Sequence, residues 1–415
     1  MRKASGNRAC ALVLSIQSIR DPLMSTLMLD YALRLQERGG GLDILLVTEE
    51  PGPTVLEPGL AERMRRARIT WRPLRYEIKG AQFLQRIRNI ARLAWWSWRF
   101  TRGYAERTVV GFLSMASAYA TLVRPFGFQR LVVVNFEPHS QYMRELGLWS
   151  ERSMKYRVVR WSEDLEVRKA DVIVAPATAV MEHVRAIRPD VEMHLQAVTI
   201  DVPANARNTA AGAEVRRRLA LEGRTVLLYI GKFQGIYYSE AEYVAFMRTA
   251  CAADPTVHHL IITHEEHRAP LLQAPGWSEV EARTTVLGPM APEALRPYLS
   301  AADLGVIAVP PTPSQRFRSP VKTALYWAAG VPILIPEGVA DDWWIARDEA
   351  VGIVVKDLPT MTGEDLRAGL ARLRSTPVDV LRARCVEVAM RLRDTGHMVD
   401  LLARLIPVPP RRPGR

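Results

Sequence analysis

A lysine stands in the first turn of a predicted helix whose two ends are marked in the sequence. Ser319 is a favourable N-cap residue, Pro320 is a favoured first helical residue, and Gly330 stands where a terminating glycine is expected. Lys322 lies in the first turn, where a cation opposes the helix dipole at a cost of about 0.3–1 kcal/mol. Free N–H groups beside basic side chains are typical of an anion site. We therefore expect Arg318, Ser319 and Lys322 to bind a diphosphate, with a solvated basic loop as the alternative.

A second basic loop precedes this helix in the same half of the chain. An apolar run at 225–230 predicts a strand, and Gly231, Lys232 and Gly235 follow it directly. Ligands of open α/β sheets bind at the carboxyl ends of the strands. Glycine lets the backbone approach a ligand, and lysine supplies a point charge that suits phosphate. Two such loops on one sheet favour a diphosphate ligand, and we expect Gly231 and Lys232 to contact it.

These segments resemble the nucleotide-sugar-binding half of retaining GT-B glycosyltransferases of family 4. The resemblance covers roughly residues 225–355 and is carried, in the family's order, by 231–238, 301–305, 319–333 and 338–342. It implies a nucleotide diphosphate sugar as co-substrate, with no other cofactor and no metal. It also implies that Lys232 and Lys322 stabilise the leaving nucleoside diphosphate as its charge develops.

The resemblance fails at a pair of glutamates that the family carries eight residues apart. Phe317 and Leu325 stand at those positions, and a leucine cannot hydrogen-bond a ribose. Weaker contacts with the nucleoside or the sugar are expected from Gly235, Glu337, Asp341 and Asp342. Two alternatives stay open: a catalytically degenerate GT-B-like binding or scaffold protein, and a nucleotide-sugar epimerase of the same fold.

The first half of the chain places polar residues after an apolar strand predicted at 130–134. Glu137 and His139 follow that strand, at the edge of the sheet where ligands bind. His139 resembles in position a family histidine beside the transferred sugar, so we predict that it is catalytic, with Glu137 as its polar neighbour. A structural loop histidine is the alternative. Glu163, in the helix that precedes residue 171, is expected to be a surface carboxylate, with an acid in the same ligand-binding cleft as the alternative.

Nearly the whole excess of positive over negative charge falls in one stretch of the chain. Residues 63–107 hold thirteen Arg and Lys against two acids, whereas the entire chain has a net charge of +12. From residue 83 onward, apolar residues recur at helical spacing with arginines between them, as in helices that lie on anionic membranes. The predicted membrane contacts are Arg86, Arg88, Arg92, Trp95 and Trp98. The alternatives are a helix that packs its aromatic side chains on the sheet and, less favoured because no nucleic-acid module accompanies it, a nucleic-acid surface.

The elements that must position these residues alternate between strands and helices along both halves of the chain. A chain of 415 residues exceeds the usual limit of one hydrophobic core, and the alternation predicts parallel sheets. We expect an α/β protein with two Rossmann-like domains facing across a cleft, as in GT-B enzymes. The expected divisions are an acceptor domain at 1–203, a donor domain at 204–385, a helix at 386–406 that packs back on the first domain, and a disordered basic tail at 407–415.

The composition of the chain indicates where in the cell the protein acts. Three widely spaced cysteines give neither a disulfide framework nor a metal site, and no apolar run is long enough to span a membrane. We expect a cytoplasmic protein, peripheral on the inner face of the plasma membrane, that binds no nucleic acid. The expected function is sugar transfer from a nucleotide sugar to a glycan or lipid-linked acceptor in cell-surface polysaccharide biosynthesis.

Overall fold

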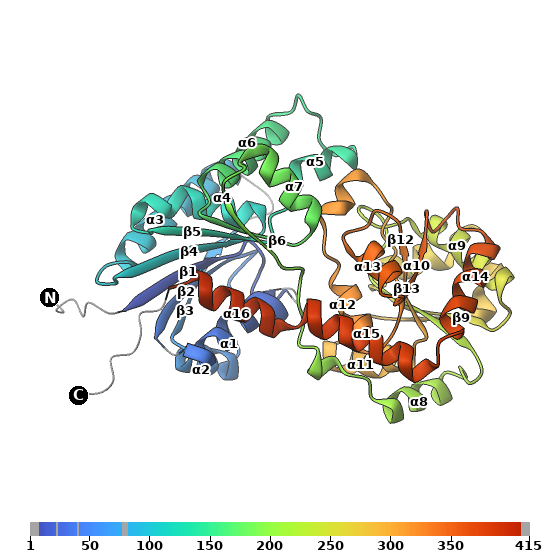
Figure 1. Cartoon of the computed structure of the whole chain (residues 1–415). Coiled ribbons are helices and arrows are strands. Elements are labelled where there is room, and N and C mark those ends of the chain that lie inside the picture. The colour runs from blue at the N-terminus through green and yellow to red at the C-terminus, as the bar shows by residue number, and fades with distance from the viewer. Residues whose placement is uncertain (1–7, 22–23, 40, 77–81, 408–415) are drawn as a thin grey trace. The chain divides into compact units, whose positions relative to one another are not determined.

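The computed structural model describes residues 8–21, 24–39, 41–76 and 82–407. The chain divides into two units, each built on its own sheet (Figure 1). Unit 1 is formed by the chain up to Ala197 and again from Thr395, and unit 2 by Val198–Asp394. The chain therefore passes from unit 1 to unit 2 between residues 197 and 198, and returns to unit 1 between residues 394 and 395. The sequence analysis placed these two domain boundaries at 203/204 and 385/386. Except for Pro407, the expected disordered tail lies outside the described residues.

The described part of unit 1 contains a parallel sheet of seven strands in the order β3-β2-β1-β4-β5-β6-β7. The strands are β1 (Ala9–Leu14), β2 (Leu42–Glu50), β3 (Ile69–Arg75), β4 (Glu106–Phe112), β5 (Arg130–Val134), β6 (Val172–Ala175) and β7 (Glu192–Leu195). The five inner strands are mostly apolar and buried, because helices cover both faces of a parallel sheet, whereas the edge strands β3 and β7 are largely exposed or half-buried. The helices are α1 (Leu29–Gly39), α2 (Pro58–Arg66), α3 (Gln82–Phe100), α4 (Ser114–Val123), α5 (His139–Glu145), α6 (Met154–Lys169), α7 (Thr178–Ile187) and α16 (Thr395–Leu405).

The helices of unit 1 form two layers. Figure 1 shows α3, α4 and α6 along one face of the sheet and α1, α2 and α16 along the other. The last helix, α16, packs against α1, and Arg38 of α1 forms an ion pair with Asp400. Leu402 and Ile406 lie beside Tyr31, so residues from both ends of the chain share one core.

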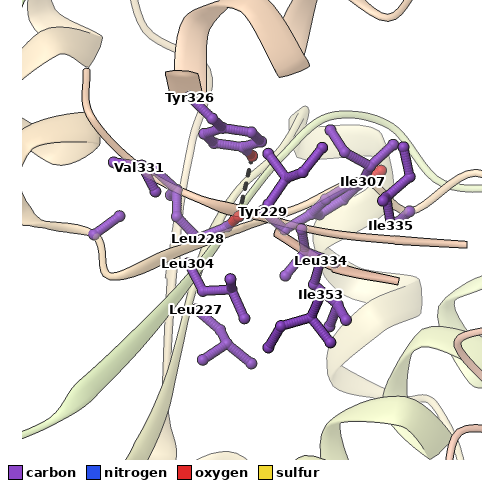
Figure 2. Packing of buried hydrophobic residues seen from close by; sticks show 14 of the residues in the cluster. Leu227, Leu228, Tyr229, Leu304, Ile307, Tyr326, Val331, Leu334, Ile335 and Ile353 are labelled. Carbon is purple, nitrogen blue, oxygen red and sulfur yellow. Dashed lines mark hydrogen bonds between the residues drawn. The ribbon is translucent and has the colours of Figure 1, made fainter. Parts of the chain in front are cut away.

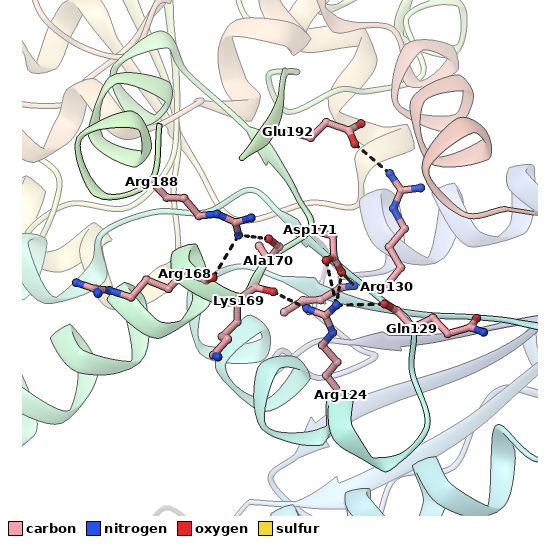
Figure 3. Close-up of polar contacts among 10 residues, drawn as sticks. Arg124, Gln129, Arg130, Arg168, Lys169, Ala170, Asp171, Arg188 and Glu192 are labelled. Atoms are coloured by element: carbon pink, nitrogen blue, oxygen red, sulfur yellow. Dashed lines mark hydrogen bonds and ion pairs between the residues drawn. The ribbon is translucent and has the colours of Figure 1, made fainter. Parts of the chain in front are cut away.

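Two arginines from the C-terminal ends of α4 and α7 bind the C-terminal end of α6 (Figure 3). Arg124 donates to the carbonyl of Lys169 at 2.6 Å and pairs with Asp171 at 2.8 Å. Arg188 donates to the carbonyl of Ala170 at 2.6 Å. Carbonyls at a helix C-terminus have no partner within the helix, and cations also favour its dipole. These contacts fix the position of α6 on unit 1.

Residues 198–394 are all described, and they form a parallel sheet of six strands in the order β10-β9-β8-β11-β12-β13. The strands are β8 (Thr225–Ile230), β9 (Val257–Ile262), β10 (Thr284–Leu287), β11 (Leu304–Val306), β12 (Ile333–Pro336) and β13 (Gly352–Val355). The helices are α8 (Thr209–Arg218), α9 (Glu240–Ala253), α10 (Glu265–Leu272), α11 (Pro292–Ala301), α12 (Val321–Ala328), α13 (Asp342–Asp348), α14 (Gly363–Arg374) and α15 (Val378–Arg393). The two sheets confirm the expected pair of Rossmann-like domains.

The core of unit 2 fixes α12 against the middle of its sheet. Tyr326 is fully buried, and its hydroxyl donates to the carbonyl of Leu228 in β8 at 3.0 Å (Figure 2). A Cβ added to Gly305 in β11 would lie 2.3 Å from the Tyr326 ring, so only glycine admits the ring at this approach. The helix that carries Lys322 is therefore held in place by a large buried side chain.

Candidate functional site

The sheet of unit 2 has a switch point beside β8. Strands β9 and β10 are added on one side of β8, whereas β11, β12 and β13 are added on the other. Ligands of open α/β sheets bind where the loops diverge at such a point, beyond the carboxyl ends of the strands. The loop after β8 and the segment between β11 and α12 flank this point, and they carry the two predicted basic segments.

The loop after β8 is held by its own backbone and by aromatic packing. The Tyr229 hydroxyl donates to the carbonyl of Lys232, and Phe233 is 2% exposed. Gln234 and Gly235 have positive φ angles of 64° and 63°, and Gln234 N–H donates to the carbonyl of Tyr238 at 2.9 Å. The side chain of Lys232 is exposed on this fixed loop.

Lys322 reaches this loop from α12. A Cβ built on Gly231 would lie 2.9 Å from Lys322 Nζ and 2.8 Å from the Tyr229 hydroxyl oxygen. Lys322 Nζ also lies 4.6 Å from the centre of the Tyr237 ring, a cation–π distance. The structure thus brings the predicted residues Gly231 and Lys322 together, and a side chain at residue 231 would have to displace the end of Lys322 or the Tyr229 hydroxyl.

The expected N-cap role of Ser319 is wrong. Helix α12 begins at Val321, Pro320 occupies the cap, and the structure assigns no side-chain hydrogen bond to that cap. The Ser319 hydroxyl instead accepts hydrogen bonds from Val198 N–H at 2.9 Å and from Arg393 Nη1 at 2.5 Å. Two internal donors already engage this oxygen, which disfavours the predicted contact with a phosphate.

The C-terminal end of α12 follows the prediction. Gly330 has a φ of 69°, and its N–H donates to the carbonyl of Trp327 at 2.9 Å. Val331 N–H donates to the carbonyl of Tyr326 at 2.9 Å. These two bonds form a Schellman motif, which satisfies helix-end carbonyls through a left-handed residue.

The residues at the family's two glutamate positions are packed rather than polar. Phe317 is 2% exposed, and the guanidinium of Arg316 lies 4.8 Å from its ring centre. Leu325 packs against the hydrophobic core of unit 2. Arg318, predicted to bind phosphate, is half-buried between Phe317 and α12.

The three acids predicted to contact the nucleoside or sugar differ in their surroundings. Glu337 follows β12 and is exposed, and Asp341 is half-buried at the start of α13. Asp342 is fully buried and forms an ion pair with Arg393, which is 1% exposed. Burial raises the pKa of the Asp342 carboxyl, and the Arg393 charge opposes that rise. Asp342 is therefore a structural residue inside unit 2, whereas Glu337 and Asp341 stay predictions.

In unit 1, His139 begins the short helix α5 after β5. Its N–H donates to the carbonyl of Glu137 at 2.8 Å. The imidazole lies 5.4 Å edge-on from the Trp149 ring and 5.9 Å from Tyr142. The backbone of Glu137 is fixed by Ser114, whose hydroxyl donates to its carbonyl and accepts from its N–H at 3.1 Å. His139 thus lies half-buried among aromatic rings on an ordered turn.

The prediction that Glu163 lies on the surface is wrong, because its side chain is 1% exposed and holds the turn of His139 through hydrogen bonds with Ser140. It accepts a hydrogen bond from Ser140 N–H at 2.7 Å and another from the Ser140 hydroxyl at 2.5 Å. Burial raises the pKa of Glu163 to about 7, although both bonds from Ser140 act against the rise. Glu166, one helical turn away, is fully buried and neither of its carboxyl oxygens has a hydrogen-bond partner. Its pKa is raised well above the usual value by burial and by Glu163.

Another buried carboxylate, Glu50, was not singled out by the sequence analysis, and it fixes the loop after β1. Glu50 ends β2 and is fully buried. Its oxygens accept hydrogen bonds from the Ser18 hydroxyl at 2.5 Å and from Ile19 N–H at 2.8 Å. Strands β1 and β4 flank the switch point of this sheet, so Glu50 fixes the loop beside the expected ligand edge of unit 1.

Comparisons of the sequence and of the structure with known proteins identify the fold of this chain. No family model matches the sequence, and no curated protein matches it either. Solved structures do match over nearly the whole chain. HepE from Anabaena in complex with UDP and glucose aligns with a TM-score of 0.68 at 12% identity, over 96% of this chain and 99% of HepE.

Two further structures agree with this match. Sucrose-phosphate synthase from Thermosynechococcus elongatus has a TM-score of 0.68 at 15% identity, over 96% of this chain and 98% of that one. A glycosyltransferase from Rickettsia africae has a TM-score of 0.69 at 9% identity, with coverage of 96% and 98%. The chain has the GT-B fold. At these identities the comparisons establish the fold.

Proposed function

We propose that this GT-B protein is a glycosyltransferase that moves a hexosyl group from a nucleotide diphosphate sugar to a glycan or lipid-linked acceptor. The observation that carries the proposal is the approach of Lys322 Nζ to Gly231 at the switch point of unit 2. A cation on a fixed helix and a close-packed glycine loop suit a diphosphate, whose charge grows as the glycosidic bond to the donor breaks. HepE, which shares the fold, was solved with UDP and with UDP-glucose.

In this proposal the protein's own cations stabilise the leaving group. Lys322 and the exposed Lys232 neutralise the developing charge on the nucleoside diphosphate, so the reaction needs no metal and no further cofactor. His139, with Glu137 beside it, contacts the transferred sugar. The setting is cell-surface polysaccharide assembly at the inner face of the plasma membrane, and membership of family 4 is part of the same proposal.

The test is a thermal-shift and calorimetric titration with UDP, GDP and ADP. One nucleotide should raise the melting temperature of the wild type. Lys322→Met keeps the length of the side chain and removes the charge. A hydrogen bond to a charged group contributes about 1.5–3 kcal/mol, so this variant should bind about 10-fold to 100-fold more weakly. Lys169→Ala, an exposed lysine at the end of α6, is the matched control and should bind like the wild type.

Two results would count against the transferase. The absence of a response to every nucleotide would remove both the transferase and the epimerase. The buried Phe317 and packed Leu325 favour one other candidate, a non-catalytic binding protein. Tight nucleotide binding without hydrolysis or transfer of any nucleotide sugar would assign the chain to that class.

A further inference from the structure

Helix α3 of unit 1 exposes its apolar side. Leu84, Ile87, Trp95 and Trp98 are exposed to 56%, 48%, 55% and 47% of their surfaces. Together with Ala91 they recur every three or four residues and so form one stripe along the helix. The side of α3 that faces the interior of unit 1 is partly polar, because Asn89 and Ser97 are buried there beside Leu93 and Ala94. The alternative that α3 packs its tryptophans on the sheet is therefore wrong for Trp95 and Trp98.

Basic side chains border this stripe. Residues 82–100 contain four arginines and no acidic residue. Arg88, Arg92 and Arg99 are exposed on the flank of the stripe. Guanidinium groups also lie over the exposed indoles, with Arg102 3.4 Å from the ring centre of Trp98 and Arg99 5.9 Å from that of Trp95.

Arg86 differs from the other arginines predicted to contact a membrane. It is half-buried, and its charge opposes the rise that burial causes in the pKa of the Glu49 carboxyl. Arg86 therefore stabilises the charge of the buried Glu49 inside unit 1 and is not one of the membrane contacts. Arg88 and Arg92 keep the predicted outward position.

A second helix of the same layer repeats the pattern. Met154, Val158 and Trp161 of α6 are exposed to 69%, 53% and 60%, and they too recur at helical spacing. Lys155, Arg157 and Arg168 are exposed beside them. Two of the three acids of α6, Glu163 and Glu166, point inward and are buried. The outward surface of α6 is thus apolar and basic, like that of α3.

The two stripes belong to one surface because α4 contacts both helices (Figure 1). Leu122 at the end of α4 and Phe126 just after it are exposed to 38% and 44%, which continues the apolar surface between α3 and α6. We name this surface, formed by the outward residues of α3, α4 and α6, the α3–α6 face. None of the helices in the described residues is long and apolar enough to cross a bilayer, so contact with one would be along the surface.

We propose that the α3–α6 face docks unit 1 on an anionic lipid bilayer. Exposed tryptophans and aliphatic side chains enter the headgroup boundary, and the bordering arginines and lysines meet the lipid phosphates. Charge complementarity selects this partner, since the face carries many exposed cations and its acids are few or buried. Single-stranded nucleic acid suits the face less well, because Leu84, Ile87 and Val158 offer aliphatic groups where base stacking needs rings. The proposal does not depend on the transferase activity.

The test is co-sedimentation of the full chain with vesicles, in the absence of any nucleotide. Wild-type protein should pellet with equimolar phosphatidylglycerol and phosphatidylcholine, and weakly with phosphatidylcholine alone. Each cation near an anionic leaflet contributes about 1 kcal/mol, so Arg88→Gln with Arg92→Gln should lower the partition coefficient by about 30-fold. Trp161→Ser should also weaken binding, which tests the contribution of α6 separately from that of α3.

The matched control is Arg65→Gln with Arg66→Gln in α2. These arginines are 76% and 78% exposed, belong to the same basic stretch, and lie on the opposite layer of unit 1 (Figure 1). The control should sediment with vesicles like the wild type. The melting temperatures of all variants should equal that of the wild type, which shows that the substitutions do not unfold the protein. Wild-type protein that stays in the supernatant, equal losses in the control and the α3 variant, or tighter binding to single-stranded poly(U) than to vesicles would each overturn the proposal. Nucleotide titration is a separate readout, so failure here leaves the proposed transferase intact.

Discussion

Replacing Glu163 with glutamine should make unit 1 more stable at alkaline pH while leaving its stability at acid pH unchanged. Glu163 is 1% exposed, and its oxygens accept two hydrogen bonds from Ser140. Glutamine has nearly the same shape, and its carbonyl can keep the bond from the backbone N–H while its amide donates to the Ser140 hydroxyl. The substitution therefore removes the titration of this residue and little of its packing.

The magnitude follows from the pKa of Glu163. Burial raises it from an ordinary 4.5 to about 7, and one pKa unit corresponds to about 1.4 kcal/mol, so ionisation costs the native state about 3 kcal/mol. Between these two values the native state binds a proton that the unfolded state has lost. The free energy of unfolding therefore falls as the pH rises from 4.5 through 7. The glutamine variant lacks this loss, because it carries no charge at any pH.

The assay compares thermal and urea unfolding of the wild type and Glu163→Gln from about pH 5 to about pH 8, the range in which the linkage operates. Titrating groups that do not interact with Glu163 are common to both proteins and cancel in the difference. Glu166 is the exception, because the Glu163 charge helps to raise its pKa; removing that charge lowers the pKa of Glu166 and so acts in the same direction as the expected gain at alkaline pH. At the alkaline end the variant should be about 3 kcal/mol more stable relative to the wild type than at the acid end, or about 5–10 °C in melting temperature. A difference that stays constant across this range would refute the inference that a buried, titrating carboxyl holds the turn of His139.

Two further predictions concern the buried ion pair of Asp342 with Arg393 and the candidate catalytic residue His139. Asp342→Ala should destabilise unit 2 by about 3–5 kcal/mol in urea unfolding, because it leaves the guanidinium of Arg393 buried without its carboxylate. Adding Arg393→Met should recover part of this loss of stability, and an unchanged stability of the single variant would contradict the ion pair. His139→Ala should lower turnover of the nucleotide sugar by about 100-fold or more, in line with the usual contribution of a positioned catalytic group, and should leave nucleotide affinity unchanged; equal turnover would make His139 a structural loop residue.

The local patterns of the sequence predicted some of the elements of each unit. The apolar runs at 130–134 and 225–230 are parallel strands, as expected. Gly330 ends α12 as predicted, since its left-handed conformation is a local property. In each case the decisive contacts lie within a few residues along the chain.

The errors arise where partners come from distant parts of the chain. Ser319 has the composition of an N-cap, but its hydroxyl is taken by Arg393, 74 residues further on. Glu163 is different, because a local signal for its burial existed. It lies on the same helical stripe as Val159 and Val167, both of which are buried. An acid on the apolar side of an amphipathic helix predicts a buried carboxyl that needs a partner.

The path of the chain through the two units has a consequence for folding during synthesis. Unit 2 is an insertion whose ends meet, since Ile200 pairs with Asp394 and Arg393 donates to the carbonyl of Val198 at 3.2 Å. A ribosome therefore completes every residue of unit 2 before it makes α16, which belongs to unit 1. Domains that are whole can fold as they emerge, whereas the face of α1 that α16 covers must wait until α16 is made. The core of unit 1 is thus completed only after all of unit 2 has been synthesised, and until then this apolar face of α1 stays uncovered.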